Sequence, residues 1–179
     1  MTQETRIIHQ VLEGDIESFR FIVEKYERSI LRMIRNILNN SQSCEDIAQD
    51  VFLTAYRKLA FFDAARSNFS TWLFTIARNK SINAMRKKRP LLMSELPNNS
   101  NVNNPSDELV EKELFNKLDA GLEALPSAQK RAFVFAVFEN LSYEEIAQIE
   151  SVRIGTIKSR INRAKKKLAK VLKEIQYER

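Results

Sequence analysis

The chain has 179 residues, of which 44% are hydrophobic, and its 29 Lys and Arg against 23 Asp and Glu give a formal net charge of +6. Its three glycines argue against sheet-rich folds with many tight turns, and the abundance of helix-forming residues predicts an all-α protein of one or two domains. The single cysteine excludes an internal disulfide, and with only one histidine beside it we expect no zinc site and no Cys-His catalytic pair.

Several function classes have little support in this sequence. No apolar run approaches the length of about 18 residues that a membrane helix needs, and no signal peptide opens the chain. Phosphate-binding glycine loops are absent, and paired carboxylates occur only on predicted helix surfaces. We therefore expect a soluble, cytoplasmic protein that is not an enzyme, with no membrane insertion, no cofactor and no metal.

Two helices are predicted first. Residues 5–13 repeat apolar side chains at helical spacing and end near Gly14, and a long helix follows over about 16–38 until Asn and Ser residues at 39–41 break it. The apolar side of the long helix predicts the first part of the core: Phe19, Ile22, Val23, Tyr26, Ile30, Ile34, Ile37 and Leu38.

The next helix begins at Ser43, which is placed to cap it, and it carries an acidic face. Its inner stripe is Ile47, Val51, Ala55 and Leu59. The candidate protein-binding residues away from that stripe are Asp46, Gln49, Asp50 and Phe52. An acidic face with an aromatic residue at its margin suits a protein partner and not DNA. An ordinary solvated face explains the same spacing equally well.

A polar loop over residues 61–70 leads into a basic helix over 71–88. No acidic residue occurs between Ser70 and Ser94, and we interpret Trp72 as part of the core. Amide and cationic side chains beside aromatic ones are typical of surfaces that hold splayed bases. The candidates for this role are Asn79, Lys80, Asn83, Arg86 and Lys87.

Residues 90–106 form the clear linker, because they hold three of the four prolines and five asparagines without helical periodicity. They divide a helical domain over 1–89 from a second one over 107–179. In the second domain, helices are predicted over 107–124 and from Pro126 onward. The expected fold is therefore two helical domains joined by a flexible linker.

The second domain ends in a helix, a break and another helix. Ser142 and Glu145 match a capping box, so the first of these helices should begin at Tyr143. The break falls at residues 150–153, where Ser151 is a candidate cap for the helix that follows. This arrangement is typical of a helix-turn-helix.

The last helix has one apolar stripe and one basic face. The stripe is Ile154, Ile157, Ile161, Ala164 and Leu168. From residue 151 onward there are ten basic and two acidic residues, so the outward face lacks the acids of an ordinary solvated helix. Such a helix fits a DNA major groove.

The candidate DNA-binding residues of this helix fall into two groups by direction. Those predicted to point away from the stripe, toward bases, are Ser159, Asn162 and Arg163, and those on the flanks, toward phosphates, are Lys158, Arg160 and Lys165. Thr156 and Lys166 complete the set.

Four motifs in this order resemble the ECF (extracytoplasmic function) sigma factors of bacterial RNA polymerase. They are EDIAQDVFLTAYRKL, FSTWLFTIARNKSINAMRKKR, the pair Leu125-Pro126, and LSYEEIAQIESVRIGTIKSRINRAKKKL. The resemblance covers nearly the whole chain. It implies an alternative sigma factor with two helical domains, sigma regions two and four, that binds core RNA polymerase and directs promoter-specific initiation.

The resemblance also implies roles for the candidate residues. The acidic face at 46–52 would dock on core polymerase, and the 61–70 loop with Asn79, Lys80 and Asn83 would hold a flipped base of the melted minus-ten element. The last helix would read the duplex minus-thirty-five element. A separate anti-sigma protein would regulate the factor.

Two rival interpretations stay open at this point. A stand-alone helix-turn-helix regulator with a helical effector domain explains the C-terminal half, but not the basic stretch that follows Trp72. An enzyme acting on nucleic acid needs a carboxylate cluster that binds a metal, and the sequence offers none.

Overall fold

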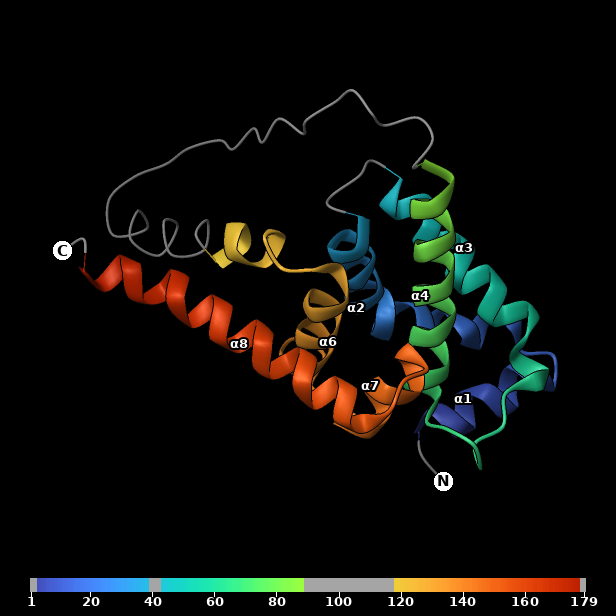
Figure 1. Cartoon of the computed structure of the whole chain (residues 1–179). Coiled ribbons are helices and arrows are strands. Elements are labelled where there is room, and N and C mark those ends of the chain that lie inside the picture. Colours follow the sequence, from blue (N-terminus) through green and yellow to red (C-terminus); the bar gives the residue numbers. More distant parts are fainter. Residues whose placement is uncertain (1–2, 39–42, 89–117, 178–179) are drawn as a thin grey trace.

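The computed structural model describes residues 3–38, 43–88 and 118–177, and every regular element within these ranges is helical (Figure 1). Residues 118–123 are also helical. The other elements are α1 (Gln3–Leu12), η1 (Ile16–Ser18), α2 (Phe19–Leu38), α3 (Cys44–Arg57), η2 (Leu59–Phe61), α4 (Phe69–Lys88), α6 (Ser127–Val137), α7 (Tyr143–Glu150) and α8 (Ile154–Tyr177). The predicted all-α fold is confirmed.

The start of the predicted long helix is a separate 3-10 turn, η1. Gly14 has a φ of +107°, a conformation that glycine adopts without strain, and it reverses the chain after α1. Asp15 then holds the turn, because its carboxylate accepts hydrogen bonds from the Ser18 amide (3.3 Å) and the Ser18 hydroxyl (2.6 Å). Helix α2 begins only after this turn, at Phe19.

Helices α2, α3 and α4 pack on one another and form the core of the N-terminal unit. The predicted stripe of α2 is confirmed: Phe19, Ile22, Tyr26, Ile30, Ile34 and Ile37 are buried, and Val23 and Leu38 are partly buried against the same core. Met33 is also buried, which the stripe did not include. The interpretation of Trp72 as core is also confirmed, since the ring is half-buried against Phe62 and Phe69. Ser43 is the N-cap residue of α3 as predicted, but its side chain makes no capping hydrogen bond there.

The C-terminal unit is built by α6, α7 and α8. Leu122 and Leu125 pack with Ala164 and Leu168 of α8 in a small second core. The larger core runs through both units, and the Phe74 ring of α4 meets the Phe135 ring of α6 edge-on at 5.6 Å. The predicted linker and its boundaries at 90 and 106 lie outside the described residues.

Candidate promoter and polymerase interfaces

The helix-turn-helix of α7 and α8 begins with the capping box predicted at Ser142. The Ser142 amide donates to the Glu145 carboxylate (2.9 Å), and the Glu145 amide donates to the Ser142 hydroxyl (3.2 Å). Helix α7 ends at Ser151, whose φ of +54° lies in the left-handed region. Ser151 therefore ends α7. We had expected it to cap α8, but the backbone carbonyl of Arg153 accepts the first bonds of that helix.

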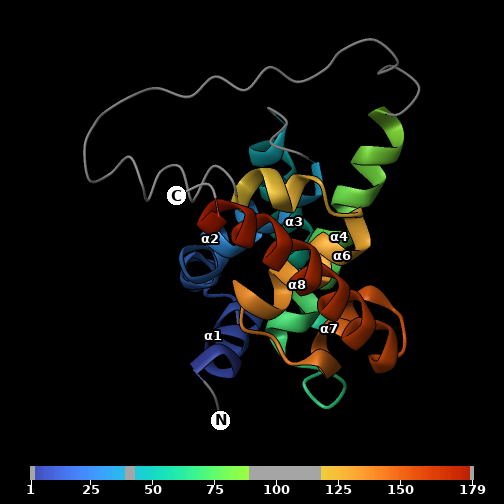
Figure 2. The ribbon, with the colours of Figure 1, turned by 60° about the vertical axis from the view of Figure 1, so that its left-hand side comes forward.

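Helix α8 buries the predicted stripe at Ile157, Ile161, Ala164 and Leu168. Ile154 is the exception: it is 38% exposed because it lies in the first turn, before α8 reaches the rest of the unit. Figures 1 and 2 show α8 running along the outside of the molecule. Its exposed candidates are Lys158, Asn162, Arg163, Lys165 and Lys166, while Thr156, Ser159 and Arg160 are half-buried.

A buried carboxylate anchors the two helices. Glu150, the last residue of α7, is 3% exposed and accepts two hydrogen bonds of 2.8 Å from Arg131 of α6. Arg160 of α8 reaches it at 3.3 Å and Arg78 of α4 at 3.5 Å. Burial by itself raises the pKa of Glu150, but Arg131, Arg78 and Arg160 more than offset this and hold the pKa below its usual value.

This network changes what Arg160 can offer to DNA. We had expected its side chain to lie free on the flank of α8 and to reach a phosphate. One of its guanidinium nitrogens is instead bound to Glu150, so only part of the group remains free. The sequence placed the helix break at Glu150 and gave no sign of this role. An acidic residue at the end of an apolar helix face, with arginines before and after it in the sequence, is the pattern that could have predicted this ion-pair network.

The acidic face of α3 is exposed as predicted at Asp46, Gln49 and Asp50, with one exception. Phe52 is only 8% exposed and packs in the core, so the expectation that it faces outward is wrong. The apolar side chain that does face outward near these acids is Leu53, which is 47% exposed. Phe52 lies one residue from the buried Val51, and α3 is covered on two sides, by α2 and by α4.

The basic face of α4 lies next to the acidic face of α3. Lys80 forms an ion pair of 2.7 Å with Asp50, so one candidate from each predicted interface is engaged with the other. Asn79 and Asn83, four residues apart on one side of α4, are both exposed, and so are Arg86 and Lys87. The Asn79 side-chain carbonyl accepts a hydrogen bond of 3.0 Å from Arg78.

The loop between η2 and α4 is held at both ends. At its start, Phe62 packs edge-on against Phe69 with ring centres 5.3 Å apart. Within it, the Asp63 carboxylate accepts from the Ala65 amide (2.9 Å) and pairs with Arg66 (3.2 Å). The aromatic residues thus form a base from which a short polar loop projects.

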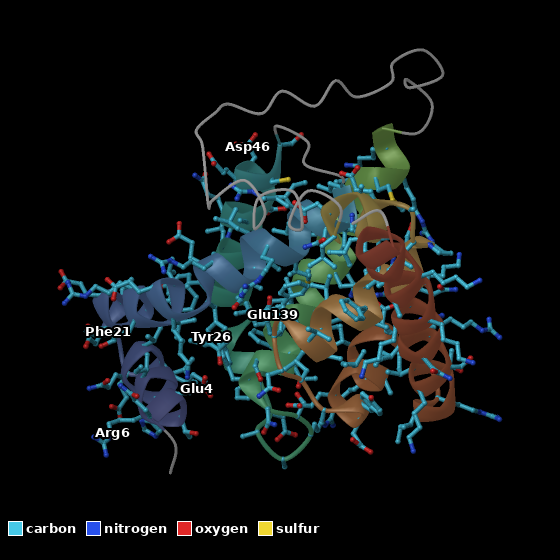
Figure 3. The ribbon with its side chains drawn as sticks, turned by 90° about the vertical axis from the view of Figure 1, so that its left-hand side faces the viewer. Glu4, Arg6, Phe21, Tyr26, Asp46 and Glu139 are labelled. Atoms are coloured by element: carbon cyan, nitrogen blue, oxygen red, sulfur yellow. The ribbon has the colours of Figure 1, made fainter. Side chains whose placement is uncertain are left out.

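Helix α7 also contacts this loop. Glu145 accepts hydrogen bonds from Asn68 (3.0 Å) and from Thr71 (3.4 Å), and the side-chain amide of Gln148 donates to the Arg66 backbone carbonyl (3.2 Å). Elsewhere Arg32 of α2 pairs with Glu139 at 2.7 Å. Figure 3 shows Glu139 close to α2, at the junction of the two units. The two units therefore lie in direct contact in this conformation.

In the part of the chain that the structure describes, no group of three or more His, Cys, Asp or Glu side chains could hold a metal ion. Likewise, no helix among the described segments is long and apolar enough to cross a membrane.

Comparison with known proteins places both units in known families. Residues 22–90 match the sigma-70 region 2 family, and residues 115–168 match the sigma-70 region 4 family. The first match includes α3 and α4, so the N-terminal unit is not that of a stand-alone helix-turn-helix regulator.

Full-length relatives agree with these matches. The chain is 34% identical to the ECF RNA polymerase sigma factor SigW of Bacillus subtilis, over 94% of this chain and 96% of that protein. It is 30% identical to the RNA polymerase sigma-H factor of Pseudomonas aeruginosa, over 97% and 95% of the two chains. The sigma factor RpoE of Bartonella quintana, solved with the anti-sigma factor NepR, superimposes with a TM-score of 0.70 at 26% identity. The match covers 88% of this chain and 98% of that one.

The residues, the fold and these comparisons agree on one assignment. Both characteristic sigma regions are present in order, and similarity to full-length relatives extends over nearly the entire chain. Sigma factors are initiation factors without enzymatic activity of their own. The chain belongs to the ECF family of RNA polymerase sigma factors.

Proposed function

We propose that this chain, an alternative sigma factor that directs promoter-specific transcription initiation, divides promoter recognition between α4 and α8 and binds core RNA polymerase through α3. Its partners are core polymerase and promoter DNA, and its work on DNA would take place in the cytoplasm. An anti-sigma protein would control it, as NepR binds the similar RpoE.

The observation that carries this division is the contrast between the exposed faces of three helices. Helix α8 presents Asn162, Arg163 and Lys165 without acidic neighbours on its own helix up to residue 170. An arginine that faces a groove can bond both acceptors of a guanine, and flanking lysines can bind phosphates. These residues suit duplex DNA, which the free face of α8 can approach along its length.

Helix α4 suits a different substrate. Asn79 and Asn83 are exposed and neutral, and each amide offers both donors and acceptors to the edge of a base. In a duplex the Watson–Crick edge of a base is paired, so a side chain reads that edge only after the base has been unpaired and extruded. We therefore assign the melted minus-ten strand to α4 and the 61–70 loop, with Lys80, Arg86 and Lys87 as cations for the backbone.

Helix α3 suits a protein. Asp46, Gln49 and Asp50 would repel a phosphate backbone, and the exposed Leu53 adds an apolar contact beside them. Figure 3 shows Asp46 at one extremity of the N-terminal unit, where a large partner can reach it. Because Phe52 is buried, it plays no part in this proposed surface.

Transcription in vitro tests the proposal. Purified core polymerase is given genomic promoter fragments with and without the chain, and transcript start sites are mapped. Discrete starts that depend on the added chain support the function. If core polymerase binds the chain but starts at the same sites without it, the function is wrong.

Asp46→Lys examines the polymerase face within this assay. It should weaken binding to core polymerase while leaving the helical fold unchanged, because the side chain is exposed. Asp46 is a cleaner choice than Asp50, whose substitution would also release Lys80. Unchanged affinity of Asp46→Lys for core polymerase would remove α3 from the interface.

A further inference from the structure

Phe61 is the most exposed of the large hydrophobic side chains that the structure describes, at 82%. It is the last residue of η2 and the first residue of the 61–70 loop that we assign to the melted strand. Within the described part of the chain its ring pairs with no other aromatic ring. Single exposed hydrophobic residues are common on protein surfaces, so the position of Phe61 matters more than its exposure.

The turn that carries Phe61 is fixed on both sides. Leu59 is buried two residues earlier, and Phe62 packs on Phe69 and Trp72 immediately afterwards. The Phe61 amide donates to the Lys58 carbonyl (2.9 Å), and the Phe62 amide donates to the Leu59 carbonyl (3.0 Å). The backbone at Phe61 is therefore held in place before any partner binds, which lowers the entropic cost of a contact made by its ring.

The charge along this part of the sequence favours a polyanion as the partner. From Arg57 to Ser94 the sequence has nine basic residues and one acidic residue, Asp63. Arg57 and Lys58 are exposed just before η2, and neither forms an ion pair with another described residue. Asp63 itself is paired with Arg66. An apolar protein surface would gain nothing from these cations, whereas a nucleic-acid strand offers both phosphates and flat base faces.

We propose that Phe61, at the start of the loop, stacks on an unpaired base of the melted promoter strand, while Arg57 and Lys58 contact the adjoining phosphates. This inference rests on the proposed function and adds a residue to it. Stacking does not depend on the identity of the base, because every base has a flat π-face. Phe61 therefore favours strand opening without contributing to the choice of promoter sequence.

The test uses the full chain with core polymerase on a promoter at which the wild-type chain initiates. A 2-aminopurine base is placed in turn at each position of the melted non-template strand, and its fluorescence reports stacking. Phe61→Ala should lower the equilibrium constant for opening by about 5- to 150-fold, the range measured when a base-stacking aromatic is removed. Stacking on Phe61 should quench the fluorescence of 2-aminopurine at one position, and Phe61→Ala should abolish this quenching.

Two further variants separate stacking from simple apolar contact. Phe61→Tyr keeps a flat aromatic ring and should open the promoter nearly as well as wild type. Phe61→Leu keeps an apolar side chain without the ring and should behave like Phe61→Ala. Because both retain a large side chain at an exposed site, they decide the question even if Phe61→Ala fails to fold.

Phe21→Ala is the matched control. Phe21 is an exposed aromatic on α2, with the Arg20 guanidinium 4.9 Å above its ring, and it lies near α1 and away from the 61–70 loop (Figure 3). Its removal should leave opening and 2-aminopurine fluorescence unchanged. All variants are also assayed for affinity to core polymerase, which should stay at the wild-type value.

Three results would overturn the inference. Opening by Phe61→Ala at the wild-type level would show that no stacked base depends on this ring. Equal activity of Phe61→Leu and Phe61→Tyr would show an apolar contact only. Weaker binding of Phe61→Ala to core polymerase would place the ring against protein. None of these results touches the sigma activity itself, which is tested by whether the wild-type chain initiates with core polymerase.

Discussion

Helices α4 and α8 are the two basic helices of the molecule, and they differ in how their cations are held. In α4, Arg78 is drawn to Glu150 and Lys80 is paired with Asp50. Among the described side chains of α8, only Arg160 is held in this way, while Arg163 and its neighbouring lysines form no ion pair with another described residue. The cations of a basic helix can thus remain free to bind a partner, as in α8. They can instead form ion pairs that hold the helix and its neutral side chains in place, as in α4.

This difference fits the two kinds of DNA that we assign to them. Free cations suit a duplex, whose two phosphate backbones attract lysine and arginine at close spacing. Bracing suits a single extruded base, because the side chains that read it must already stand in the right geometry when it arrives. The exposed asparagines of α4 lie on a helix that ion pairs fasten to α3 and to α7.

The largest expected effect comes from removing the carboxylate that braces both helices. Glu150→Ala leaves Arg131, Arg78 and Arg160 around a site without a negative charge, and breaking a buried ion pair costs about 3–5 kcal/mol. Urea unfolding should show this loss. The control is Glu144→Ala in the same helix, an exposed residue whose loss should cost under about 1 kcal/mol. Equal stability of the two variants would mean that the ion pairs of Glu150 do not stabilise the fold.

The same carboxylate predicts a pH dependence. The pKa of Glu150 in the folded chain lies below the unfolded value of about 4.3, so its stabilisation is complete above that value and is lost as the pH falls through the folded pKa. The difference in unfolding free energy between wild type and Glu150→Gln should therefore be constant near neutral pH and shrink below about pH 4.3. A difference that grows on acidification would contradict this.

The second effect concerns the face of α8. Arg163→Ala should relax the preference at one or two positions of the upstream element, by about 1–3 kcal/mol of discrimination, because a bidentate guanine contact is lost. The measurement is binding to a panel of single-base variants of the duplex. Uniform weakening with an unchanged pattern of preference would make Arg163 a backbone contact.

A smaller effect is expected at Lys165 on the flank of the same helix. Lys165→Ala should weaken all duplex sequences alike and reduce the slope of log affinity against log salt by about one unit. Binding at several salt concentrations measures this slope. A change in base preference without a change in slope would show that our division of α8 into base and phosphate contacts is wrong.

The smallest effect comes from releasing a cation of α4. Asp50→Asn frees Lys80 from a partly exposed ion pair, so stability should change by under about 1 kcal/mol, while affinity for single-stranded DNA should rise modestly. Asp46→Asn removes the same charge without releasing Lys80 and should raise that affinity less. An equal rise for both variants would show that only the total charge matters.

The fold and the outline of the interfaces could be predicted from the sequence because they follow from local patterns. The stripe of α2, the capping box at Ser142 and the outward direction of Arg163 depend on helical spacing and on short-range hydrogen bonds. Such features do not depend on which other helix lies nearby.

The errors arise where a second element decides the outcome. Phe52 is buried because α3 is covered on two sides, and a single stripe cannot reveal that. The pairs of Asp50 with Lys80 and of Glu150 with Arg78 join residues that are 30 and 72 positions apart in the chain. Ser151 takes a left-handed conformation that serine seldom adopts, so its place at the end of α7 had no clear signal.

The assignment of melted strand to α4 and duplex to α8 is tested most directly by assaying one variant of each helix on both kinds of DNA. Asn79→Ala and Arg163→Ala, each with core polymerase, are assayed on an intact duplex upstream element and on a promoter whose minus-ten region is already unpaired. We predict that Asn79→Ala loses affinity only for the unpaired strand and that Arg163→Ala loses base preference only on the duplex. Equal losses by either variant on both substrates would contradict the assignment of melted strand to α4 and duplex to α8.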